Sequence, residues 1–408
     1  MTRPQHVVHI GFHASDAQAV EFDRDHVTAV LPRASAARLP RPLVARFARV
    51  ATFDLPDSSD LDSYDRAADL IRDCVAQLAA EFGPPAAVVG LHEHTTLPAA
   101  RIREHFGVPG TDVRTATLCR DKVSMKRALA EAGVRVPRFA AVGPDTTREE
   151  LARFADGVAG RIVLKPRSQA ASIGVHILDG AGELLELASR GGIEAGYEAE
   201  EFVPGTVHHL DGVVRDGTVR WFSAARYLDS CFDFQYRNAP LASVTVDDAA
   251  MVARTLEYTG TVLRALGLRD SAFHLELFHT PTDELVFLEI GNRFGGAGVV
   301  DQQHTVYGVD LAREAVLACL GRPSELPAAA TILDRPGVGA SGWLYLPLTE
   351  KARCRVTGVA GLDDLPGSVV RAAGFVAGES AGPGAVRLKN SSTSPFVIRP
   401  PLPVPLPS

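Results

Sequence analysis

The sequence predicts an α/β protein that begins with a Rossmann-like parallel sheet. Residues 7–12 and 86–91 are short apolar runs, as buried parallel strands are. Residues 61–82 and 95–107 carry apolar side chains at helical spacing, and each of these segments is followed by or ends in a glycine. Strands that alternate with helices form parallel sheets, which bind ligands beyond the carboxyl ends of their strands.

The bulk composition is that of a soluble globular protein with more than one domain. The chain has 408 residues, of which 46% are hydrophobic and 22% charged, and this length predicts two or three domains. A net charge of -7 disfavours nucleic acid as a partner. We see no membrane-spanning run and no signal-peptide core, and we therefore expect a cytoplasmic protein. The five cysteines are scattered without a CxxC pair, which predicts reduced thiols.

An acidic hairpin is the most informative segment. In FHLELFHTPTDELVFLEIGNRFGG (273–296), two strands flank the loop PTDE. If the loop is symmetric, Glu276 lies opposite Glu289 on the same face, with Cβ atoms about 5 Å apart. Only His274 and Arg293 could neutralise this repulsive pair locally, so we expect a divalent cation, with Mg²⁺ as the natural candidate. The alternative is a solvent-facing acidic pair on an edge hairpin.

A second segment has the features of a phosphate-binding loop. KPRSQAASIGV (165–175) follows an apolar strand. Lys165 can offer its ammonium group to a phosphate, and the loop N–H groups and the hydroxyls of Ser168 and Ser172 can donate hydrogen bonds. Gly174 lets the chain turn into the next strand. An ordinary hairpin with an exposed lysine is the alternative.

Five motifs in a fixed order carry a family resemblance. They are RDK (120–122), LKPRSQAASIGV (164–175), EEFVPG (200–205), HLELF (274–278) and LEIGNRFGG (288–296). Over residues 86–325 the chain resembles the ATP-grasp superfamily, and specifically its carboxylate–amine ligases, such as the L-amino-acid ligases that make dipeptides. The resemblance implies an ATP-grasp fold with four parts: 1–117 (Rossmann-like), 118–200 (small subdomain), 201–328 (large subdomain) and 329–408 (mostly β, with a proline-rich tail).

The resemblance also implies roles for individual residues. ATP would be bound by Lys122 and Lys165, by the flap at 168–174, and by a hinge that reads the adenine edge, formed by Glu200, Glu201, Phe202 and Val203. Glu276 and Glu289 match the magnesium carboxylates, where Mn²⁺ can substitute. Arg293 matches an arginine that stabilises the acyl phosphate and the tetrahedral intermediate.

The sequence departs from the family pattern at three points. Gln169 and Ala171 stand where relatives often have glycines, so we expect a stiffer flap. Val207 replaces a ribose-binding glutamate, and the candidates to replace its hydrogen bond are His208, His209 and Asp211. The usual metal-binding asparagine is shifted by one residue to Asn292, and such a shift turns a strand side chain to the other face.

The implied reaction has two steps. A small-molecule carboxylate, an amino acid by resemblance, attacks the γ-phosphate of ATP to give an acyl phosphate and ADP, and an amine then displaces phosphate. The candidates for a general base are His274, His304 and Glu93, the last of which lies with His92 and His94 beyond a predicted strand. We expect Arg226 to contact phosphate or a substrate carboxylate, and the irregular segment 228–240 to cover the substrate site.

Three other functions are alternatives to the ligase. A carboxylase of the biotin-carboxylase type would activate bicarbonate, but the sequence has no AMKM-like biotinylation stretch. A non-catalytic nucleotide-binding module would have little reason to keep the repulsive glutamate pair. An NAD-linked oxidoreductase would require GxGxxG after the first strand, where the sequence reads GFHASD. Relatives of the ligases are commonly homodimers, although no segment here marks an interface.

Overall fold

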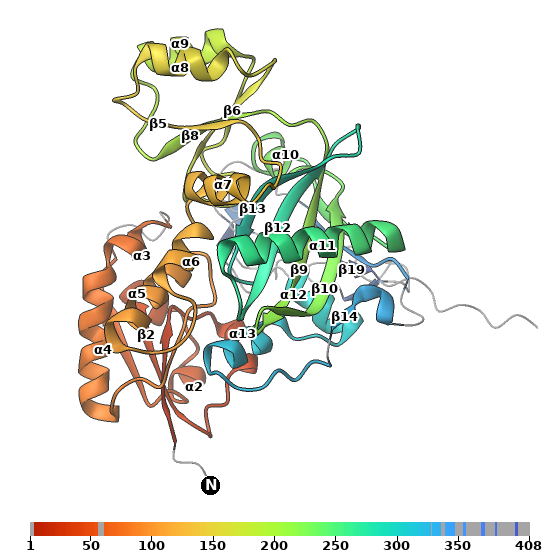
Figure 1. Cartoon of the computed structure of the whole chain (residues 1–408). Helices are drawn as coiled ribbons and strands as arrows, with labels where there is room; N and C mark the ends of the chain where they lie inside the picture. Colours follow the sequence, from red (N-terminus) through yellow and green to blue (C-terminus); the bar gives the residue numbers. More distant parts are fainter. Residues whose placement is uncertain are drawn as a thin grey trace, which may run out of the picture.

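The computed structural model describes residues 4–327 except 56–60, together with 329–335, 339–346 and four short strands between 354 and 398. It has the predicted mixed α/β architecture, and three sheet-based units follow one another along the chain (Figure 1). Within these ranges no helix is both long and apolar enough to cross a membrane. The cysteines whose side chains are described are free thiols.

The N-terminal unit is a parallel four-stranded sheet in the order β3-β2-β1-β4. Its strands are β1 (His6–Ile10), β2 (His26–Pro32), β3 (Arg49–Phe53) and β4 (Ala87–Val89). Helices α4 (Ala68–Phe82) and α5 (Thr96–Phe106) pack on the sheet. The remaining short helices are η1 (Ala14–Ala19), α1 (Arg33–Ala36), α2 (Arg41–Val44) and α3 (Ser63–Arg66).

The predictions for this unit are largely confirmed. The apolar runs at 7–12 and 86–91 form β1 and β4, and Gly107 ends α5 in the left-handed conformation. The helix expected over 61–82 is divided into α3 and α4 at Ala67. Strands β2 and β3 were not predicted, because β2 ends in a proline and β3 is a half-buried edge strand without a clear apolar run.

The second unit is an antiparallel sheet in the order β5-β8-β6-β7, covered by α8 (Arg148–Ala155) and α9 (Ala181–Ser189). Its strands are β5 (Phe139–Val142), β6 (Ile162–Pro166), β7 (His176–Leu178) and β8 (Tyr197–Glu201). Helices α6 (Val113–Leu118) and α7 (Lys122–Glu131) lead into it. Asp121 caps α7, because its carboxylate accepts a 2.7 Å hydrogen bond from the Ser124 N–H.

The third unit is a large sheet in the order β13-β12-β9-β10-β11-β15-β19-β17, with β14 (Ala330–Thr331) beside β10. Its other strands are β9 (Thr206–Arg215), β10 (Thr218–Tyr227), β11 (Leu241–Thr245), β12 (Ser271–His279), β13 (Leu285–Gly291), β15 (Gly342–Tyr345), β17 (Val369–Arg371) and β19 (Phe396–Ile398). The associated helices are α10 (Cys231–Arg237), α11 (Ala249–Leu266), α12 (Val299–Gln302), η2 (Gln303–Tyr307), α13 (Leu311–Cys319) and η3 (Ile332–Asp334).

Two predictions for the third unit need comment. The segment 228–240, expected to be irregular, contains helix α10, because the Ser230 hydroxyl caps it by accepting from the Asp233 N–H at 3.0 Å. The segment predicted as a separate β-rich part, 329–408, contributes β15 to the large sheet through pairing with β11, while β16 (Cys354–Arg355) and β18 (Ser380–Ala381) pair with each other. The proline-rich tail lies outside the described residues, and the four-part division stays a prediction.

Gly212 at the centre of β9 sets a steric limit on the large sheet. A Cβ at this position would lie 2.2 Å from the Trp221 carbonyl oxygen and 2.6 Å from the Phe273 ring. We expect Gly212→Ala to destabilise the protein by about 3 kcal/mol, because neither neighbour can withdraw. Thermal melts measure the effect. Gly182→Ala in α9, where the added methyl meets nothing within 4 Å, is the control and should be neutral or stabilising; equal melting temperatures for the two variants would contradict the prediction.

Candidate active site

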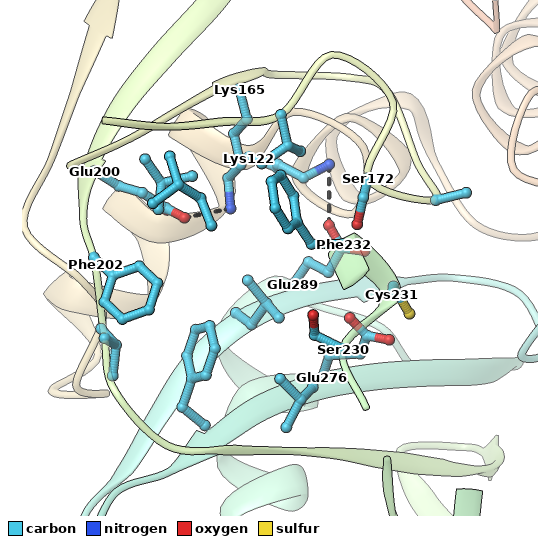
Figure 2. Close-up of a pocket in the computed structure, with 18 of the residues that line it drawn as sticks. Lys122, Lys165, Ser172, Glu200, Phe202, Ser230, Cys231, Phe232, Glu276 and Glu289 are labelled. Atoms are coloured by element: carbon cyan, nitrogen blue, oxygen red, sulfur yellow. Dashed lines mark ion pairs between the residues drawn. The ribbon is translucent and has the colours of Figure 1, made fainter. Parts of the chain in front are cut away.

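A cavity of about 350 Å³ lies between the small and the large sheets. One wall comes from β6, β8 and the loop after β6, and the other from β9, β12 and β13, while α10 lies at its edge (Figure 2). Nine of the sequence-predicted site residues line it: Lys122, Lys165, Ser172, Glu200, Glu201, Phe202, Val203 and the acidic pair Glu276 and Glu289. The structure therefore brings together most of the residues that the motifs singled out.

The wall of the small sheet holds a lysine and a glutamate in a buried ion pair. Lys165 Nζ lies 2.6 Å from Glu200 Oε1. Burial alone would raise the pKa of Glu200, but Lys126 and Lys165 outweigh it and lower that pKa to about 2. The Glu200 carboxylate is thus ion-paired with Lys126 and Lys165. Glu201 Oε1 lies 3.0 Å from Arg135 Nη2. Hydrogen bonds to an adenine edge would fall to the hinge backbone, while the Phe202 ring, on which Arg161 stacks at 3.6 Å, offers only an apolar face.

The predicted flap is tied down at several points. Lys122 Nζ donates to the Gln169 carbonyl oxygen at 2.7 Å. The Tyr236 hydroxyl of α10 donates to the Ser172 carbonyl oxygen at 2.9 Å and accepts from the Gly174 N–H at 3.0 Å. Ser168 is turned away from the cavity, and its hydroxyl donates to Asp62 Oδ2 at 2.7 Å.

The flap backbone shows the consequence of its missing glycines. Ala171 and Ser172 have φ of 55° and 57°, in the left-handed region that non-glycine residues adopt at a cost. Because the flap holds this conformation only with the help of its contacts, those contacts shape the wall of the cavity.

The acidic pair faces the cavity from the large sheet. Glu276 and Glu289 are directly paired between β12 and β13, as predicted. The loop is not symmetric as the sequence argument assumed. Near the turn the register differs by one residue from that of a symmetric loop, with Leu277 opposite Phe287. A β-bulge at Leu288 restores the pairing, and both Leu288 and Glu289 line the cavity.

Each acid has its own cationic neighbour. His274 Nε2 lies 3.3 Å from Glu276 Oε1, and the Tyr227 hydroxyl donates to the same oxygen at 3.0 Å. Lys122 Nζ lies 3.0 Å from Glu289 Oε2. Lys122 thus neutralises Glu289 from a distant part of the sequence, and the charge of Arg293 also acts on both carboxylates.

The pair still fits a divalent cation. Both contacts of Glu276 are made by Oε1, and among the described residues none is made by Oε2. Two carboxylates from paired strand positions, opening on one cavity with two lysines across it, match the preference of Mg²⁺ for carboxylate and phosphate oxygens.

Behind Glu276 lies a chain of buried hydrogen bonds. Asp211 bridges two histidines, with Oδ1 at 2.8 Å from His274 Nδ1 and Oδ2 at 2.6 Å from His209 Nδ1. His209 Nε2 lies 2.6 Å from the Ser243 hydroxyl. Both ring nitrogens of His209 are therefore occupied and the residue does not line the cavity, so it is not placed to bind a ribose as the sequence suggested.

The same network decides the protonation of His274. Burial would lower its pKa, but the charge of Asp211 and the hydrogen bonds to Asp211 and Glu276 raise that pKa to about 10. A histidine that is protonated at neutral pH acts as a positive charge and a donor, not as a general base. His304, another candidate base, is exposed on η2.

Arg293, two residues after the end of β13, is held in place by a residue of the N-terminal unit. Its Nε lies 2.7 Å from Glu93 Oε2, while Arg120 Nη1 lies 3.1 Å from Glu93 Oε1. Burial would raise the pKa of Glu93, but the two arginines lower it to about 2. Glu93 is therefore a fixed anion that orients Arg293, and it is not a base near neutral pH.

Replacing Glu93 should make stability less dependent on acid pH. Because the pKa of Glu93 falls from 4.5 to about 2 on folding, its ion pairs stabilise the protein fully above about pH 4.5 and lose this effect as the pH falls towards 2, a contribution on the order of 3 kcal/mol. We expect Glu93→Gln to lower the melting temperature at neutral pH, and the gap to wild type to narrow in acid. Glu81→Gln, which breaks an exposed pair with Arg49, is the control; a gap that is constant with pH would contradict the assignment.

Arg226 and Asn292, like Ser168, His209, His274 and Arg293, do not line the main cavity. Arg226 lines a second cavity of about 330 Å³ with His208 and the start of α11, because its strand neighbour Tyr227 takes the face towards Glu276. Asn292 is buried one residue after β13, where its carbonyl oxygen accepts from the Ser271 hydroxyl at 3.1 Å, and it does not line the main cavity.

Helix α10 and its N-cap Ser230 supply lining residues from the segment 228–240, which the sequence singled out only as a whole. Ser230, Cys231, Phe232, Asp233 and Arg237 line the cavity beside the acidic pair. Burial and the charges of Glu276 and Glu289 raise the pKa of the Cys231 thiol well above its usual value. The Ser230–Asp233 spacing is a helix-capping signal that could have revealed the helix.

Comparisons with known proteins agree with this geometry. No family model matches the chain. It is 25% identical over 280 residues to an L-arginine-specific L-amino acid ligase of Bacillus subtilis, an alignment that covers 65% of this chain and 64% of the relative. The chain thus spans less than two thirds of that relative's length.

Solved structures share nearly the whole fold. An L-amino acid ligase from Bacillus licheniformis superposes with a TM-score of 0.70 at 19% identity, over 98% of this chain and 93% of the other. The biotin carboxylase domain of a 2-oxoglutarate carboxylase from Hydrogenobacter thermophilus, in complex with MgADP and bicarbonate, gives a TM-score of 0.69 at 17% identity, over 98% and 87%. These findings confirm the predictions of fold and resemblance: the chain has the ATP-grasp fold and is similar in sequence to L-amino-acid ligases.

Proposed function

We propose that the protein is an ATP-dependent, ADP-forming ligase that joins a small-molecule carboxylate, an amino acid, to an amine. The observation that carries the proposal is that Lys122 and Lys165 line the same cavity as the paired carboxylates Glu276 and Glu289. Triphosphate binding needs cations on one side and a bound divalent metal on the other, and this cavity offers both sets of groups. Similarity to an L-amino acid ligase supports the choice of substrate class.

The residues of the chain have distinct tasks in this reaction. Lys165 and Lys122 would neutralise phosphate oxygens, and the flap backbone at 169–172 would cover them. Glu276 and Glu289 would hold Mg²⁺, which supplies charge neutralisation between the phosphates when bound. Arg293, oriented by Glu93, offers a planar fork to the acyl phosphate.

The chemistry balances in two steps. A carboxylate oxygen attacks the γ-phosphorus of ATP, and the bond from that phosphorus to the β-bridging oxygen breaks to release ADP. The amine nitrogen then attacks the acyl carbon, the carbon–oxygen bond to phosphate breaks, and the amine loses one proton. The pKa values of His274 and Glu93 do not suit either residue to take that proton, and the departing phosphate can accept it.

A hydroxylamine trap tests the proposal directly. The protein is incubated with Mg-ATP, hydroxylamine and one amino acid at a time, and hydroxamate and ADP are measured together. Equal amounts of both products, dependent on the acid, support an acyl phosphate. AMP with pyrophosphate would mean adenylation and would overturn the proposal.

The same assay separates the second candidate function. The biotin carboxylase domain has almost the same structural similarity as the L-amino acid ligase, so the fold alone does not exclude bicarbonate as the activated acid. ADP release that depends on bicarbonate, with no hydroxamate from any amino acid, would favour the carboxylase. Tight Mg-ATP binding without turnover on any acid would favour a non-catalytic module.

A further inference from the structure

Four buried charges form a cluster behind the small-sheet wall of the cavity. Lys126 Nζ lies 2.6 Å from Glu198 Oε1 and 2.6 Å from Glu200 Oε2. Lys165 Nζ lies 2.6 Å from Glu200 Oε1 and 3.9 Å from Glu198 Oε1. The side chains of Lys126 and Glu198 are 0% exposed, so their charges have no access to water.

The cluster has a front pair and a rear pair. Lys165 and Glu200 line the cavity, whereas Lys126 and Glu198 do not. Glu200 connects the pairs, because one of its carboxylate oxygens contacts Lys165 and the other contacts Lys126. Two positive and two negative groups make the cluster neutral, as a buried set of charges must nearly be.

The rear pair comes from elements that already position the site. Lys126 lies one turn after Lys122 on α7, so the two lysines project from the same side of the helix. Lys122 reaches the flap and Glu289, and Lys126 reaches the strand β8. Glu198 and Glu200 alternate on β8 and therefore point to the same face of the small sheet.

We propose that Lys126 is a positioning residue for nucleotide binding, which acts by neutralising Glu198 and so leaving Lys165 free to bind phosphate. The inference rests on the proposed function, since it assumes that the cavity binds ATP. Without Lys126, two carboxylates would compete for Lys165, which already lies within 3.9 Å of Glu198. The ammonium group would then be drawn back from the cavity.

The test is a charge-balance cycle on nucleotide binding. Dissociation constants for Mg-ATP and for adenosine are measured by calorimetry for wild type, Lys126→Met and Lys126→Met/Glu198→Met, with thermal melts for folding. We expect Lys126→Met to raise the Kd of Mg-ATP at least about tenfold and that of adenosine by less than about threefold, because adenosine has no phosphate. The double variant keeps one positive and one negative charge, and should return the Kd of Mg-ATP to within about threefold of wild type.

Each outcome decides a different point. A Kd of Mg-ATP in Lys126→Met equal to that of wild type, or equal weakening for adenosine and Mg-ATP, would overturn the positioning role. So would a double variant that binds Mg-ATP as weakly as the single one. If Lys126→Met does not fold, the double variant decides. A Kd of Mg-ATP more than about threefold above that of wild type would then overturn the positioning role. A wild-type chain that does not bind Mg-ATP would overturn the proposed function itself.

Discussion

Glu276→Gln is expected to lower kcat/KM in the hydroxamate assay by about 100- to 1000-fold, or about 3–4 kcal/mol of transition-state stabilisation. Glutamine has nearly the same size, and its amide oxygen can still accept from the Tyr227 hydroxyl that now contacts Glu276 at 3.0 Å. What is lost is the negative charge that, with Glu289, would hold Mg²⁺. The variant loses the ion pair with His274 at 3.3 Å but is relieved of the repulsion from Glu289, so the main effect should fall on catalysis.

The measurement is a series of rates at increasing Mg²⁺, with a melting temperature for each variant. The variant should need more Mg²⁺ for half-maximal rate, and its melting temperature should stay near that of wild type. Glu284→Gln removes an exposed glutamate from the turn of the same hairpin, and should leave the rate unchanged. A Glu276→Gln enzyme with normal rate and normal Mg²⁺ dependence would contradict the metal role.

Lys122→Met is expected to lower kcat/KM for ATP by about 100-fold. Lys122 Nζ joins two walls of the cavity, because it contacts the Gln169 carbonyl oxygen of the flap at 2.7 Å and Glu289 Oε2 at 3.0 Å. Methionine fills a similar volume but has no charge. Glu276 and Glu289 would then lose one of their two cationic neighbours, and the flap would lose an anchor.

The kinetic pattern distinguishes this variant from Glu276→Gln. Because Lys122 would bind ATP in the proposed reaction and also anchors the flap, KM for ATP should rise and kcat should fall together, whereas added Mg²⁺ should restore little. Arg127→Met, an exposed position on the same helix α7, is the matched control. Rates within about threefold of wild type for Lys122→Met would show that Lys165 suffices for the phosphates.

The sequence predicted the fold and the two walls of the site because the relevant signals are local. The ordered motifs contain Lys165, the hinge and the acidic hairpin, which lie on β6, at the end of β8 and on β12 with β13, and periodicity finds β1, β4 and α5. The predicted pairing of Glu276 with Glu289 was also right. It arises because the register near the turn differs by one residue from that of a symmetric loop, and a bulge at Leu288 compensates for this difference. Counting residues outward from the turn cannot predict a bulge, since the pattern of apolar and polar residues does not reveal which residue is inserted.

The contacts that were missed join residues far apart in the sequence. Glu93 holds Arg293 across 200 positions, and Lys122 neutralises Glu289 from another unit of the fold. Arg226 was assigned to the site, but strand parity turns Tyr227, and not Arg226, towards Glu276. The pKa of His274 depends on Asp211, which reaches it only through strand pairing. Long-range pairing of this kind is not visible in one sequence.

The contact between Tyr236 and the flap has a consequence for how the flap can evolve. Within the described residues, the hydrogen bonds of the phenol hydroxyl go only to main-chain groups, the Ser172 carbonyl oxygen and the Gly174 N–H. Since every residue except proline carries both groups, Ser172 can be exchanged for another side chain without loss of this tether. Gly174 is less free, because its φ of 72° favours glycine. The flap can therefore drift in side-chain chemistry, and in the ligands it suits, while α10 keeps hold of its backbone.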